Sequence, residues 1–115
     1  MIEMTGKVLN RDILIGLIGN DPEMAREFEQ EFLQQANSSL VKLVGFYNKS
    51  QMPQIKDEAH YLKTSAKAVG AEQTAALLQE LEVVATNADK AKCKQLIKLV
   101  NDAVTRVKGE VLNEK

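Results

Sequence analysis

The sequence is short of residues that interrupt helices and of residues that form disulfides or bind metals. Its 115 residues include two prolines, six glycines, one cysteine and one histidine. A lone cysteine, Cys93, cannot form an internal disulfide, which agrees with a reducing cytoplasm. The formal net charge of −1 provides no basic excess for nucleic acid. The longest apolar stretch, residues 13–19, is too short for a membrane span, and the N-terminus does not resemble a secretion signal. We therefore expect a soluble, cytoplasmic protein that binds neither nucleic acid nor membrane.

The scarcity of helix breakers and the absence of β-branched alternation predict long helices. Apolar residues recur at helical spacing, and local signals mark where the helices begin and end. Asp21-Pro22-Glu23 is a strong helix start, and Gly70 is free to adopt the left-handed conformation that ends many helices. We predict helices over residues 10–18, 22–47, 51–68, 71–85 and 89–112.

Each of the four longer segments has one apolar stripe, so the four are expected to share a core. In the segment over 22–47 the stripe consists of Phe28, Phe32, Ala36, Leu40, Leu43 and Tyr47. Cys93 falls on the stripe of the last helix, which favours a buried packing role. Short connections make sequential helices antiparallel. The sequence thus predicts one all-α domain over residues 1–115, an up-down-up-down antiparallel four-helix bundle. The segment over 10–18 is a short additional N-terminal helix that covers one end.

His60 is the most chemically specific residue of the chain. At about 100° per residue it falls on the polar face of its helix, together with Lys56, Lys63 and Lys67. Nearby positive charges favour the neutral imidazole, which is a nucleophile toward activated phosphoryl groups. The same lysines can pair with a phosphoryl group once it is attached. The pattern indicates a phosphoryl carrier, although an inert histidine on a lysine-rich surface has the same spacing.

A longer set of residues carries a resemblance to a known family. The set comprises His60, Leu62, Lys63, Ser65, Gly70-Ala71, Leu77-Leu78 and Leu81-Glu82. In this order they resemble the histidine-containing phosphotransfer domain of phosphorelays, and the five-helix layout extends the resemblance over nearly the whole chain. The resemblance implies that His60 receives a phosphoryl group from the aspartate of a response-regulator receiver domain, or passes one to it. It also implies that Lys63 stabilises the phosphoryl group.

Two further positions follow from the same resemblance. Thr64 replaces the glycine that usually follows the lysine, and its hydroxyl either bonds back to the His60 carbonyl or crowds an incoming receiver domain. We expect Thr64 to slow phosphoryl transfer or to narrow the range of partners that take part in it. Glu82 lies where many members have a glutamine near the imidazole. Its carboxylate can accept a ring N–H or remain a solvated charge, and we favour the solvated charge.

Other candidate binding residues are less specific. Lys56 and Lys67 are second choices for pairing with phosphate, and they fit equally well as solubilising charges. Ile13, Leu17 and Tyr61 are candidate apolar contacts for a partner, and each has an alternative role in ordinary packing.

The sequence contains no nucleotide-binding string and no set of metal ligands. We therefore expect a monomeric phosphoryl carrier without kinase activity or cofactor, with Mg²⁺ supplied by the receiver domain. The expected partners are a response-regulator receiver domain, a hybrid sensor histidine kinase, or both. Two other interpretations stay open. One is a bundle that binds a receiver or kinase without accepting phosphate, with Thr64 as the sign of lost transfer. The other is a purely structural helical adaptor.

Overall fold

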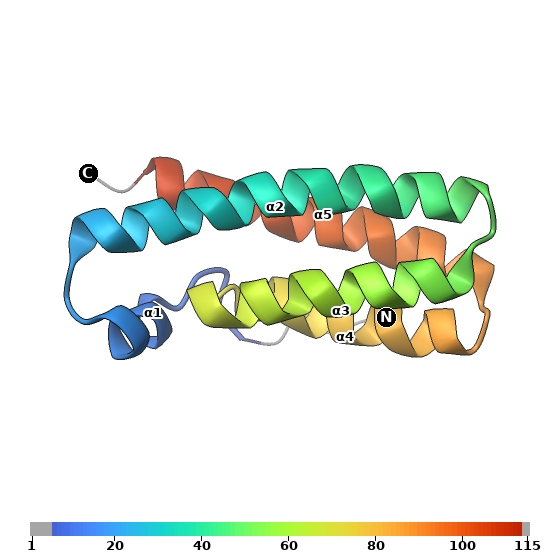
Figure 1. The fold of residues 1–115 in the computed structure, drawn as a ribbon, viewed down its shortest axis with the longest axis horizontal. Helices are drawn as coiled ribbons and strands as arrows, with labels where there is room; N and C mark the ends of the chain where they lie inside the picture. The colour runs from blue at the N-terminus through green and yellow to red at the C-terminus, as the bar shows by residue number, and fades with distance from the viewer. Residues whose placement is uncertain (1–5, 114–115) are drawn as a thin grey trace.

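The computed structural model describes residues 6–113, and these residues form five α-helices without a β-strand. In chain order they are α1 Arg11–Ile18, α2 Pro22–Asn48, α3 Met52–Val69, α4 Glu72–Thr86 and α5 Lys90–Leu112 (Figure 1). The predicted all-α class and the five predicted segments are confirmed, with bounds that differ by a residue or so. Within residues 6–113, no helix is both long enough and apolar enough to cross a membrane.

The four long helices lie side by side, with α2 and α5 uppermost in Figure 1 and α3 and α4 below them. Helix α2 packs against α3 and α5, and α4 packs against the same two helices. The shared core contains large, fully buried side chains from all four helices. They include Phe32, Leu43, Ile55, Leu62, Leu78, Leu81, Leu96 and Val100. Cys93 is also buried in this core, as predicted.

The start of α2 departs from the predicted apolar stripe. Phe28, which we expected in the core, is 41% exposed, whereas the adjacent Glu29 is buried. The Glu29 carboxylate lies 3.4 Å from Nε of Arg11 on α1, so the buried charge has a cationic partner. The prediction for Phe28 was wrong because α1, and not the bundle core, covers this first part of α2 (Figure 1). Arg11 of α1 pairs with the buried Glu29 carboxylate, which accounts for the polar side chain at this covered position.

The segment before α1 is fixed across the turn between α3 and α4. The Asn10 N–H donates to the Gly70 carbonyl at 2.7 Å, and the Gln73 N–H donates to the Lys7 carbonyl at 3.1 Å. Gly70 ends α3 with a φ of 83°, and a Cβ there would lie 2.0 Å from the Asn10 carbonyl oxygen. Only glycine fits this close approach. The turn therefore sets where α1 lies and how α4 folds back along α3.

Candidate functional site

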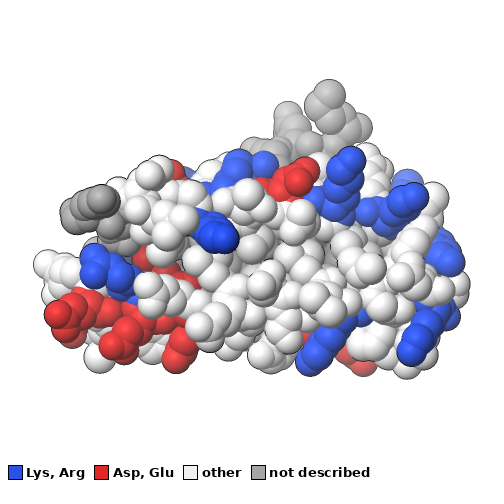
Figure 2. All heavy atoms as spheres, turned by 90° about the horizontal axis from the view of Figure 1, so that it is seen from above, with Lys and Arg blue, Asp and Glu red and all other residues white. Residues whose placement is uncertain are grey.

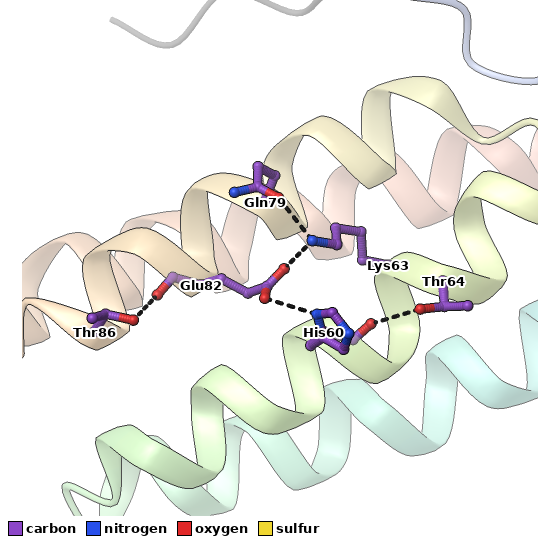
Figure 3. Close-up of polar contacts among 6 residues, drawn as sticks. All are labelled: His60, Lys63, Thr64, Gln79, Glu82 and Thr86. Atoms are coloured by element: carbon purple, nitrogen blue, oxygen red, sulfur yellow. Dashed lines mark hydrogen bonds and ion pairs between the residues drawn. The ribbon is translucent and has the colours of Figure 1, made fainter.

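His60 lies near the middle of α3, with its side chain 66% exposed, as the sequence predicted. Its neighbours Ala59 and Leu62 are fully buried and hold this part of α3 against the core. The ring is not free in solvent, however. Its Nδ1 lies 3.0 Å from Oε1 of Glu82, which comes from α4 (Figure 3). The Glu82 carboxylate therefore holds one edge of the imidazole and leaves the other edge accessible.

Glu82 joins the histidine to Lys63. Its second oxygen, Oε2, lies 2.6 Å from Nζ of Lys63, and the two side chains are only 13% and 11% exposed. Lys63 also donates to Oε1 of Gln79 at 2.7 Å. Figure 3 shows His60 and Lys63 of α3 facing Gln79 and Glu82 of α4. Each pair is three residues apart, so each shares one helix face.

The preference for Glu82 as a solvated charge was wrong. Helix α4 returns closely along α3 after the Gly70 turn, which places Glu82 opposite both His60 and Lys63. The expected electrostatics of the histidine change as well, because the charged group facing its ring is a carboxylate. The ammonium of Lys63 turns toward that carboxylate, so Lys63 is not the freely exposed lysine that the sequence suggested.

The protonation of Glu82 determines which ring nitrogen carries hydrogen. Burial alone would raise the pKa of Glu82. Hydrogen bonds from Lys63 and His60, together with their positive charges, outweigh it and lower the pKa below the ordinary value. An ionised carboxylate can only accept hydrogen bonds, so Nδ1 of His60 must be the donor. In a neutral ring the lone pair then lies on Nε2, and within residues 6–113 that nitrogen has no hydrogen-bond partner.

Threonine hydroxyls bond to the backbone on both sides of the site. Thr64 Oγ1 donates to the His60 carbonyl at 3.2 Å, which is the first of the two alternatives considered for this residue. Thr86 Oγ1 donates in the same way to the Glu82 carbonyl at 2.8 Å. The Thr64 side chain is thus turned along the helix, although it stays exposed next to His60.

The remaining predicted residues lie around the site without contacting the imidazole. Lys56 and Lys67 are exposed, and no carboxylate of residues 6–113 pairs with either one. Lys67 and Ile13 line a surface hollow of about 520 Å³ that also includes Gln79, so α1 reaches the edge of the site. Leu17 on α1 and Tyr61 beside His60 are both exposed. A role for the three apolar residues in partner contact stays a prediction.

Sequence reasoning missed Gln79. The available signal was its position three residues before Glu82 on one face of the same helix, which places both side chains opposite Lys63. No group of three or more potential metal ligands occurs in the part of the chain that the structure describes.

The fold and the site together define a helical protein that presents one exposed histidine between two packed helices. The Hpt domain family matches residues 23–110, and the chain belongs to this family. Family members are histidine phosphotransfer proteins that carry phosphoryl groups in phosphorelays, where they interact with receiver domains and histidine kinases.

A solved structure is similar over nearly the whole chain. The histidine-containing phosphotransfer protein B (HptB) from Pseudomonas aeruginosa PAO1 superimposes with a TM-score of 0.83 at 18% sequence identity, covering 96% of this chain and 100% of that chain. At this identity the likeness concerns the fold. No curated protein matches the chain.

Proposed function

We propose that Nε2 of His60 accepts a phosphoryl group from the aspartyl phosphate of a response-regulator receiver domain, and returns it in the reverse direction. The single observation that carries this proposal is the contact of Nδ1 with the ionised Glu82, which leaves the Nε2 lone pair toward solvent. Family membership supports the same assignment.

The proposed transfer needs no base to remove a proton. The Nε2 lone pair forms the N–P bond while the P–O bond to the aspartate breaks, and the aspartate leaves as a carboxylate. The imidazole ring gains a positive charge during this step, and its Nδ1–H stays opposite the Glu82 carboxylate. Glu82 therefore stabilises the charge that develops on the ring.

Lys63 has a matching role on the phosphoryl side. Its ammonium has three donors, of which Glu82 and Gln79 occupy two. The third donor can pair with a phosphoryl oxygen. Thr64 adds bulk where the family usually has glycine, so we infer slower or narrower transfer than a glycine would allow. Lys56 and Lys67 add a diffuse positive field, and Ile13, Leu17 and Tyr61 form apolar contacts with the receiver.

We also infer that α2 to α5 form the up-down-up-down antiparallel bundle predicted from the sequence, an arrangement favoured by the short turns between successive helices. A single domain, a monomeric state, a cytoplasmic location and Mg²⁺ bound by the partner receiver domain stay predictions of the same kind.

The test is incubation of the chain with a receiver domain that carries phosphate on its aspartate. We expect a label on the chain that is stable in base and lost in acid, and that disappears in His60→Gln. A chain that binds the receiver without becoming labelled would instead be an adaptor that has lost transfer. A Thr64→Gly variant should accept the label faster than wild type. Equal rates of labelling in the two proteins would show that Thr64 does not slow transfer.

A further inference from the structure

A second surface of the molecule combines apolar and basic side chains on the side away from His60. A groove of about 360 Å³ runs between α2 and α5 and is lined by Leu40, Val44, Tyr47, Asn48, Lys94, Ile97, Lys98 and Asn101. His60 lies instead between α3 and α4, which occupy the opposite side of the bundle (Figure 1). A partner in the groove would therefore leave the histidine accessible.

The two walls of the groove differ in chemistry. The α2 wall is largely apolar, and Val44 on it is 48% exposed. The α5 wall presents Lys94 and Lys98, which are four residues apart and so lie on one helix face. Leu40 and Ile97 are nearly buried and form the floor.

The charged side chains that line the groove, those of Lys94 and Lys98, have one sign. Residues 32–50 contain two lysines and residues 90–101 contain four, and neither segment has an acidic residue. Within residues 6–113, no carboxylate pairs with Lys94 or Lys98. Figure 2 looks onto this side and shows mainly basic side chains along both edges of an uncharged strip on the right, with isolated acidic side chains among them and most acidic side chains at the left end. An occupant must therefore combine an apolar surface with negative charge.

We propose that this groove docks an acidic amphipathic helix of a partner protein. Apolar residues of such a helix, spaced by three or four positions, would lie against Val44 and Tyr47. A pair of acidic residues four positions apart on its flank would match the spacing of Lys94 and Lys98, about 6 Å along the axis. The proposal is independent of phosphotransfer by His60.

Other classes of partner fit this surface less well. The floor is recessed, so a flat anionic membrane would reach the lysines without reaching Leu40 or Ile97. The Tyr47 ring is the aromatic group available for stacking on a nucleic-acid base in this groove, and the Lys90 ammonium already lies 4.9 Å from its centroid. A helix can enter the groove and contact both walls at once.

The test uses a fluorescein-labelled synthetic peptide of about 14 residues, four helical turns, with leucines on one face and glutamates along one flank. Binding to the full chain is measured by fluorescence anisotropy, and ¹H–¹⁵N spectra locate it. We expect shifts at Val44, Ile97 and Asn101 with none at His60, and unchanged binding in His60→Gln. A peptide of the same composition but scrambled spacing should bind at least about tenfold more weakly, and equal binding of the two would overturn the proposal.

Charge variants distinguish peptide binding in the groove from nonspecific electrostatic attraction to the chain. Lys94→Glu with Lys98→Glu should weaken peptide binding about tenfold, because two favourable charge contacts become unfavourable. Arg26→Glu with Lys108→Glu makes the same change in net charge at exposed positions outside the groove lining and should have little effect. Equal losses of peptide affinity in the two double variants would mean that the attraction is nonspecific, and would refute binding in the groove.

Apolar variants and vesicles complete the design. Val44→Ser should weaken binding, whereas Val41→Ser, at a more exposed position outside the lining, should not. Vesicles of phosphatidylcholine and phosphatidylserine are the second probe. If they bind the chain through Lys94 and Lys98 while the peptide does not, the surface recognises lipid and the proposal is wrong.

Discussion

Replacement of Glu82 by glutamine tests the central contact of the site. The substitution keeps the size of the side chain and an oxygen that can accept the Nδ1–H of His60, but it removes the negative charge. In the structure that charge lies 3.0 Å from Nδ1 and 2.6 Å from the Lys63 ammonium. Because the ring becomes positive as the N–P bond forms, we expect Glu82→Gln to slow transfer more than it disturbs the fold.

The magnitude follows from the geometry. Hydrogen bonds to charged groups contribute about 1.5–3 kcal/mol. Glu82 is mostly buried, but the imidazole is two-thirds exposed, so solvent screens part of the interaction. A loss of about 1–1.5 kcal/mol in the transition state corresponds to a rate roughly five to ten times lower.

The assay is the rate of label transfer from a phosphorylated receiver domain to the chain. Glu80→Gln is the matched control, because Glu80 lies on the same helix and is exposed. Nitrogen NMR of His60 provides an independent readout, since the wild-type ring should carry its hydrogen on Nδ1 and the variant should show a weaker preference. Equal transfer rates in Glu82→Gln and Glu80→Gln would refute the role given to the carboxylate.

Three further predictions concern stability, each measured by urea unfolding. The pKa of Glu82 is lowered in the folded state from 4.5, so its carboxylate should stabilise the fold above that value and lose this effect as the pH falls through the folded-state pKa. Glu82→Gln should therefore be less stable than wild type at about pH 6, and the difference should shrink as the pH falls below 4.5; a constant difference would contradict this. Gly70→Ala should cost about 3 kcal/mol or more, because it adds a backbone clash to a left-handed φ, whereas Gly45→Ala in open space should stabilise slightly. Phe32→Ala should cost about 3–5 kcal/mol and the exposed Phe28→Ala much less, and similar losses would argue that both rings belong to the core.

Much of the fold was predictable because its signals are local. The Asp21 side chain accepts the Met24 N–H at 3.1 Å, as a capping aspartate before a proline predicts. Asp89 caps α5 in the same way by accepting the Lys92 N–H at 3.2 Å. These signals act within a few residues, so they can be read without knowing what packs where. The error at Phe28 arose where α1 covers α2, which is a contact between separate elements.

In the candidate site, too, some features follow from local sequence and others from contacts between separate helices. The sequence by itself determined that His60 lies on the polar face of a helix one turn from Lys63, because helical periodicity places residues on faces. Only the tertiary structure decided that the ring faces Glu82, and that Lys63 turns to the same carboxylate and to Gln79. Those contacts depend on how far α4 slides along α3 after the Gly70 turn. That register depends on packing across the whole α3–α4 interface, and no single stretch of sequence encodes it.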